Sequence, residues 1–160
     1  MKLRNLLIAL AVLLIFTGCG EKEIVLDLEK VEIELNSLEL EEDGEKVKLF
    51  ENSSKMELEK LENKYGMDTS VFEEVLVTTS SNLDTASMYA IFLPKEDKIS
   101  DAETEMENFF EKYDQAWIMG YFPEEELLVE NRLEETYGDY YIYIISKDNE
   151  LAFDKIKTTK

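Results

Sequence analysis

The ionisable side chains of this 160-residue chain limit the chemistry that it can perform. The chain has 37 acidic and 17 basic residues, one cysteine and no histidine. Without histidine, Ser-His-Asp catalysis, Cys-His catalysis and histidine-ligated metals are excluded. Carboxylate pairs remain, and these hydrolyse glycosides when they face each other across a cleft at about 5–10 Å. With 37 acidic residues, such pairs arise by chance, and a chain of 160 residues has little room for a deep cleft. We therefore expect no enzyme activity.

The acidic residues gather in three clusters, at residues 39–43, 124–126 and 134–135. A calcium site needs about six to eight oxygens at fixed positions, and no cluster has the D-x-[DN]-x-[DN]-G spacing of an EF-hand loop. The six glycines form neither G-x-x-x-x-G-K nor G-x-G-x-x-G, so the sequence contains no phosphate-binding loop. We expect solvated anionic surfaces, no cofactor and no metal site. Weak association of Ca²⁺ or Mg²⁺ is the alternative.

The single cysteine, Cys19, follows a segment with the features of a signal peptide. Lys2 and Arg4 supply a short positive region, and residues 6–16 are an unbroken apolar run. A membrane-spanning helix needs about 20 apolar residues, whereas the core of a signal peptide needs about 7 to 15. The segment therefore predicts export across a membrane, after which the leader is removed.

Four residues at the end of this segment, Phe16-Thr17-Gly18-Cys19, resemble the lipobox of bacterial lipoproteins. Phe16 departs from the leucine that the lipobox prefers. The resemblance implies a diacylglyceryl thioether on Cys19 and cleavage before it, so that Cys19 becomes the first residue of the mature protein and its lipid anchors the protein at the extracytoplasmic face of the cell membrane. Two acyl chains hold a protein on a membrane stably, whereas one does not. An ordinary secretory signal or an uncleaved anchor is the alternative.

The charge of the processed chain restricts its partners. Cleavage after residues 1–18 removes two basic residues, so 15 basic and 37 acidic residues remain, with a net charge of −22. Residues 19–27 should then be an acylated cysteine with a short tether, and residues 28–160 a single domain. Nucleic acid and anionic headgroups repel so negative a protein, the latter within a Debye length of about 8 Å. We expect the lipid to hold it at the membrane and a basic protein, peptide or cell-wall component to be the favoured partner.

The Ser-x-x-Glu pattern of a capping box opens two predicted helices, at Ser54–Glu57 and Ser100–Glu103. The first helix should stop at Gly66. The second should cover residues 99–117, where apolar residues recur every three or four positions and one face must be buried. Trp117, at the end of that face, fits core packing.

Four strands are expected in two antiparallel hairpins, at residues 75–79, 88–93, 127–133 and 140–145. Residues 27–40 fit both a helix and a strand, and we favour a helix with Asp27 as its N-cap. Another helix is expected at residues 148–156. The order α-α-β-β-α-β-β-α predicts an α+β fold of two layers, an antiparallel sheet of about four strands with helices packed on one face.

Residues 54–157 resemble an uncharacterised family of small bacterial lipoproteins, mostly Gram-positive, that share a domain of unknown function. The resemblance rests on the two hairpins, the long helix and three segments, Tyr65-Gly66-Met67-Asp68, Tyr121-Phe122-Pro123-Glu124-Glu125 and Leu128-Val129-Glu130-Asn131. It implies a domain on the outer face of the cytoplasmic membrane. It implies no known activity, cofactor or catalytic residue.

Two aromatic groups are candidates for partner binding. Alternation places Tyr141 and Tyr143 on one face of the last strand, and an exposed tyrosine-rich face would be a binding platform. The alternative is that helices cover both faces of that strand. Tyr121 and Phe122 would form either a recognition loop or a hydrophobic corner between the long helix and the second hairpin.

Two functions remain open. The first is a membrane-anchored, non-catalytic interaction module that binds a partner through Tyr141 and Tyr143. The second is a small-ligand-binding or cation-binding lipoprotein associated with a transporter. A cavity of more than about 300 Å³, lined by aromatic residues and a few convergent polar groups, would favour the second.

Overall fold

The computed structural model describes residues 24–117 and 121–159 of the chain. The predicted signal peptide, the lipobox and Cys19 lie outside these residues. Where the described chain begins, it already lies against the domain. Leu26 is 4 % exposed, and Ile24 packs so closely on Gly138 that a Cβ there would lie 2.9 Å from Ile24 Cβ. Residues just before position 28, the predicted start of the domain, thus already contact the folded part of the chain.

Helices and strands alternate along the chain. The helices are α2 (Leu28–Asn36), α3 (Leu58–Lys60), the π-helix η1 (Leu61–Tyr65), the 3₁₀ turns η2 (Thr69–Val71) and η3 (Glu96–Lys98), α4 (Ile99–Gln115), α5 (Pro123–Glu130) and α6 (Asn149–Thr158). The strands are β1 (Glu39–Glu42), β2 (Glu45–Lys48), β3 (Ser53–Lys55), β4 (Phe72–Ser80), β5 (Met88–Pro94), β6 (Leu133–Tyr137) and β7 (Tyr140–Ile145).

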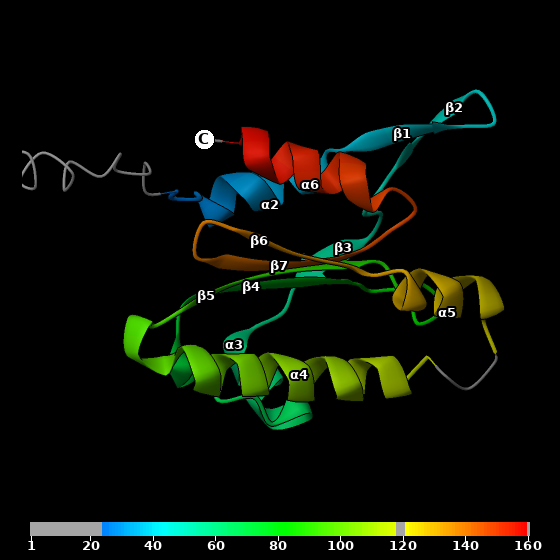
Figure 1. Ribbon diagram of the computed structural model, residues 1–160. Helices are drawn as coiled ribbons and strands as arrows, with labels where there is room; N and C mark the ends of the chain where they lie inside the picture. The colour runs from blue at the N-terminus through cyan, green and yellow to red at the C-terminus, as the bar shows by residue number, and fades with distance from the viewer. Residues whose placement is uncertain (1–23, 118–120, 160) are drawn as a thin grey trace, which may run out of the picture.

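The predicted α+β class is confirmed, and the two predicted hairpins are neighbours in one antiparallel sheet. The sheet has five strands in the order β3-β4-β5-β7-β6. About four strands were predicted for this sheet, and the fifth strand is β3 at its edge. A separate two-stranded sheet, β1-β2, extends from the body beside α6 (Figure 1).

Helices cover both faces of the sheet, so the prediction of two layers with helices on one face is wrong. Figure 1 shows α3 and α4 below the sheet and α2 and α6 above it. One core joins α4 and η1 to the sheet, and a second joins α2 and α6 to the opposite face. The reason lies in the central strands, because β5 and β7 bury apolar side chains on both faces. Such strands need cover on both sides.

The apolar stripe of α4 forms the lower core, as its spacing predicted. Its buried side chains are Ala102, Met106, Phe109, Phe110 and Tyr113. The helix begins at Ile99, as predicted, but the predicted capping box is wrong, because Lys98 and not Ser100 is the N-cap, and it makes no side-chain cap bond. Ser100 is already inside the helix, where its carbonyl accepts a hydrogen bond from Thr104 Oγ1.

The capping box predicted at Ser54–Glu57 is also wrong. Ser54 belongs to edge strand β3 and pairs with Thr79 of β4. The helix starts at Leu58, and Glu57 makes no side-chain cap bond. Its predicted end is confirmed, because Gly66 caps it in the left-handed conformation with φ 68°.

The strand predicted at residues 127–133 is wrong, because α5 occupies Pro123–Glu130 and β6 begins only at Leu133. Pro123 stands in the first turn of α5, where a missing N–H has no cost, and three glutamates follow it. Carboxylates at this end interact favourably with the helix dipole. The second hairpin therefore consists of β6 and β7, with its turn at residues 138–139.

The ambiguous residues 27–40 form mainly a helix, as predicted, and Asp27 accepts the cap hydrogen bond from the Lys30 amide. Beyond α2 the chain turns into the β1-β2 hairpin. Its Asp43-Gly44 turn has two positive φ angles, 54° and 83°. This conformation is typical of two-residue hairpin turns.

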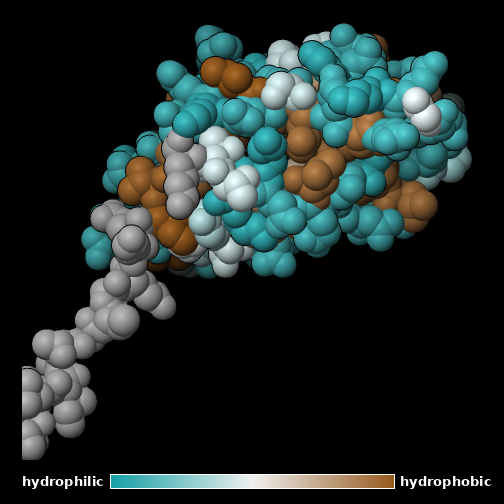
Figure 2. Space-filling view, turned by 90° about the horizontal axis from the view of Figure 1, so that it is seen from above, coloured by the Kyte–Doolittle hydropathy of each residue, from teal (hydrophilic) through white to brown (hydrophobic). Residues whose placement is uncertain are grey.

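The outer surface is mainly polar. Figure 2 shows the face that carries α2 and α6, on which hydrophilic side chains cover most of the area and hydrophobic patches are small. Within residues 24–117 and 121–159, every helix is too short or too polar to cross a bilayer.

Candidate functional site

Tyr141 and Tyr143 lie on one face of β7, as alternation predicted, but α4 covers that face. The Tyr143 ring packs against Phe110 in a tilted arrangement with 4.2 Å between ring centroids, and burial raises the pKa of Tyr143 to about 12. Tyr141 Oη donates a 2.9 Å hydrogen bond to Glu103 of α4. Partial burial and this bond raise the pKa of Tyr141. The two tyrosines thus form part of the interface between sheet and helix, and each side chain stays only partly exposed.

Tyr121 and Phe122 lie at the mouth of a cavity of about 470 Å³. Their side chains are 78 % and 40 % exposed, which fits a rim better than a packed corner. The cavity is lined by segments far apart in the sequence: β3 and the residues that follow it, α3 and η1, the end of β4 with the β4-β5 loop, the end of α4, and the residues before α5. The site is therefore a product of the fold.

Aromatic rings and small polar groups share the lining. The aromatic members are Tyr65, Tyr113, Trp117, Tyr121 and Phe122, and Met56 and Leu83 add apolar surface. The polar members are Ser54, Lys60, Lys64, Thr79, Ser80, Ser81, Asn82 and Thr85. Rings can stack on an apolar ligand body, while hydroxyl and amide groups fix its orientation.

The wall formed by the β4-β5 loop is held in place at Ala86. The Ala86 amide donates a 2.7 Å hydrogen bond to Glu125 of α5. The Ala86 carbonyl accepts one of 2.7 Å from Tyr113 Oη of α4. Burial raises the pKa of Tyr113, so this phenol keeps its proton and stays a donor. Both backbone polar groups of Ala86 are thus held by side chains from two different helices.

A π-helix forms the opposite wall. In η1, Leu61 and Tyr65 are buried, and Lys112 Nζ of α4 donates a hydrogen bond to the Tyr65 carbonyl. The wider turn of η1 places Tyr65 at the cavity while Lys60 and Lys64 stay exposed along its edge. Single π turns of this kind occur frequently at functional sites.

The hydrogen bond from Tyr113 to the Ala86 carbonyl should contribute measurably to the stability of the fold. Tyr113→Phe removes a buried donor and leaves the Ala86 carbonyl without it, which should lower the free energy of unfolding by about 1–3 kcal/mol. Tyr141→Phe is the matched control, because its hydroxyl bond to Glu103 is exposed. Urea denaturation of both variants measures the difference. Equal losses would show that the buried bond does not hold the loop.

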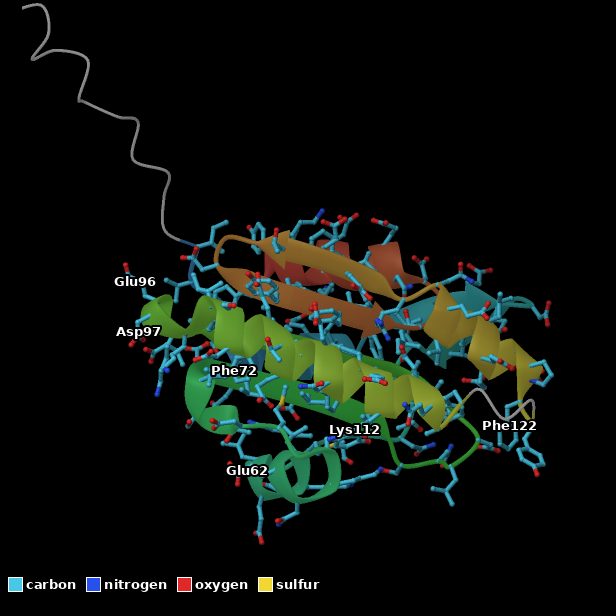
Figure 3. All side chains as sticks on the ribbon, turned by 60° about the horizontal axis from the view of Figure 1, so that its bottom comes forward. Glu62, Phe72, Glu96, Asp97, Lys112 and Phe122 are labelled. Carbon is cyan, nitrogen blue, oxygen red and sulfur yellow. The ribbon has the colours of Figure 1, made fainter. Side chains whose placement is uncertain are left out.

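The cavity and the start of the described chain lie at opposite ends of the sheet. Met88 of β5 pairs with Ile145 at the end beside the β4-β5 loop, and Phe92 pairs with Tyr141 at the other. Ile24 contacts Gly138 at that second end. A seven-residue strand is about 20 Å long. In Figure 3, Phe122 accordingly lies at the opposite end of α4 from Glu96 and Asp97.

A second hollow, of about 530 Å³, lies near Tyr141 and Gly138. It is larger, but it has one aromatic residue in its lining and three carboxylates, those of Glu73, Glu96 and Asp139. It also lies beside the point where Ile24 meets the domain. In the described part of the chain, no three acidic side chains come together as a candidate metal site. The aromatic cavity is therefore the stronger candidate.

Sequence reasoning found part of this site. It singled out Tyr121 and Phe122, assigned Trp117 to the core and did not select Lys60, Lys64 or the β4-β5 loop. Trp117 is half-buried, so it contributes both to the core and to the cavity. Gly66 was predicted as the helix stop, whereas Tyr65 was not selected as a site residue.

Residues 46–146 match a domain of unknown function, DUF4358. The match begins in β2 and ends just after β7, so it contains the whole five-stranded sheet, α4 and α5. Every residue that lines the aromatic cavity falls inside it. No match is found among curated proteins or among solved structures.

Proposed function

The chain belongs to the DUF4358 domain family, and because the function of that domain is unknown, we propose a function from the site itself. The protein is a lipid-anchored lipoprotein on the extracytoplasmic face of a Gram-positive cell membrane, and its domain binds a small molecule without transforming it. The observation that carries the proposal is the aromatic cavity of about 470 Å³. Small-molecule sites have volumes of about 300–1,000 Å³ and the same mixture of rings and a few polar groups.

The anchor is supported by the amino-terminal sequence. A lipobox-like segment ends at Cys19, the single cysteine of the chain. The domain begins by residue 24, so an acyl group on Cys19 would hold it close to the membrane. The cavity lies at the far end of the sheet from Ile24. This arrangement favours a ligand from the surrounding solution.

Binding without catalysis is supported by the lining. Among the described residues, the cavity has no aspartate, glutamate, cysteine or histidine in its lining. General acid–base work by a carboxylate or an imidazole therefore has no candidate there. The two lysines are exposed. Stacking, hydrogen bonding and charge recognition are the chemistry that these side chains offer.

A titration followed on Trp117 tests the proposal, because this residue is the only tryptophan of the chain and lines the cavity. Its indole N–H gives a single resonance in the ¹H–¹⁵N spectrum of the full chain in a non-ionic detergent. Small cyclic molecules should shift this resonance saturably. They should also raise the unfolding temperature, since a ligand bound only by the native state stabilises it. An indole resonance that no member of a diverse library shifts would overturn the ligand-binding function.

A further inference from the structure

The charged side chains that line the aromatic cavity are positive, whereas the net charge of the protein is negative. The full chain has a net charge of −20, with 37 acidic residues. Yet the charged side chains in the cavity lining are Lys60 and Lys64, and no described carboxylate joins them. In a chain with more than twice as many acidic as basic residues, this local excess of positive charge points to a requirement of the site.

The two lysines are also available to a ligand. They are four residues apart on α3 and η1, which places them on one side of the helix. Lys64 Nζ lies 4.9 Å from the centroid of the Tyr65 ring. Among the described residues, neither lysine has a carboxylate within ion-pair distance. Other lysines do pair with carboxylates, namely Lys46, Lys98, Lys147, Lys155 and Lys157.

We infer that the ligand is a small organic anion whose apolar or aromatic body packs against the cavity rings and whose carboxylate lies at Lys60 and Lys64. The inference rests on the proposed function and adds the charge and shape of the ligand. An ammonium group is a compact point charge that suits a carboxylate. The hydroxyl groups and Asn82 of the β4-β5 side can bond further polar atoms of the ligand.

The overall negative charge makes this site selective. Cations associate weakly with acidic side chains all over the surface, so a cationic ligand would gain little from one cavity. An anion is repelled everywhere except where local positive charge acts at contact distance. Salt screens distant carboxylates beyond a Debye length of about 8 Å, whereas groups in contact are screened less. The cavity lies away from Ile24, so a dissolved anion reaches it more readily than a lipid headgroup.

Three molecules with the same ring test the inference: 2-naphthoate, 2-naphthylmethanol and 2-naphthylmethylamine. Each is titrated into the full chain in a non-ionic detergent and followed on the Trp117 indole resonance. With two exposed lysines at the site, the carboxylate should bind about fivefold or more tighter than the alcohol, and the amine should bind weakest. The advantage of the carboxylate should shrink as salt rises.

Two double variants distinguish the effect of the cavity lysines on ligand affinity from the effect of the protein's overall charge. Lys60→Gln/Lys64→Gln should bind carboxylate and alcohol equally. Lys46→Gln/Lys155→Gln, which removes the same charge from β2 and α6, should keep the preference. Equal affinities in the wild type, or a preference that survives Lys60→Gln/Lys64→Gln, would overturn the anionic ligand while the cavity remained a binding site. If none of the three molecules shifts the indole resonance saturably, the inferred aromatic anion is overturned, whereas the proposed ligand-binding function fails only if the diverse library gives no shift either.

Discussion

Cys19→Ser should abolish both the acylation of the protein and the removal of its leader. A serine oxygen cannot form the thioether, so the variant should lose both acyl chains and the cleavage that follows acylation. Labelling cells with a radioactive or clickable fatty acid should mark the wild type and leave the variant unlabelled. The variant should also migrate more slowly, because residues 1–18 stay attached. The expected effect on labelling is all or none, because Cys19 is the single cysteine of the chain.

Gly20→Ser is the matched control, because it introduces the same side chain one position later and leaves the thiol in place. It should be labelled and should remain in the membrane fraction after a high-salt wash. Label and mobility unchanged in Cys19→Ser would rule out the lipoprotein assignment. An ordinary secretory signal would then be the better interpretation of the leader.

Phe109→Ala should lower the free energy of unfolding by about 3–5 kcal/mol, the largest stability effect that we expect. Phe109 is 1 % exposed and lies at the centre of the aromatic cluster beneath the sheet. Its ring lies 4.7 Å from Tyr65 and 4.9 Å from Phe110, measured between centroids. Truncation leaves a void bordered by η1 and α4, which also form the floor of the cavity.

Phe122→Ala makes the same truncation at the rim of the cavity, where the ring is 40 % exposed. Little apolar area returns to water there, so the loss should stay below about 1 kcal/mol. Urea denaturation at constant pH compares the two variants. Similar losses of unfolding free energy in the two variants would mean that Phe109 does not contribute specially to the stability of the core between α4 and the sheet.

The parts of the fold that the sequence predicts best are those whose pattern is set by burial. The apolar stripe of α4 fits little other than an amphipathic helix, and the apolar runs of β5 and β7 fit little other than buried strands. The same runs showed that both faces of β7 are apolar, and weighing that fact more heavily would have predicted helices on both sides. Patterning predicts which faces are buried, whereas the number of layers depends on which helices reach each face.

The errors have local causes. Two Ser-x-x-Glu patterns resemble capping boxes. Ser54, however, is a residue of strand β3, and Ser100 lies inside α4 rather than at its start. Leu127, Leu128 and Val129 suggested a strand, although Pro123 and three following glutamates mark a helix start. The Asp43-Gly44 pair is a sequence signal of a two-residue hairpin turn, and it lies between β1 and β2, a hairpin that was not predicted.

The cavity itself could be predicted only in fragments. Its walls come from segments up to about 70 residues apart, which the sheet register and the packing of α4 bring together. Aromatic residues at helix ends, such as Trp117, Tyr121 and Phe122, suggest a corner or a rim equally well. The charge contrast at Lys60 and Lys64 becomes visible only when the surrounding residues are known.

Blocking the cavity tests the central claim most directly. Ala116 lines the cavity at the end of α4, so Ala116→Phe should fill part of it, whereas Gln115→Phe adds the same ring to the neighbouring exposed position. Titrated with 2-naphthoate and followed on the Trp117 indole resonance, the wild type and Gln115→Phe should show the same saturable shift. Ala116→Phe should bind at least about tenfold more weakly. Undiminished binding to Ala116→Phe would contradict the account, because the ligand would then bind elsewhere.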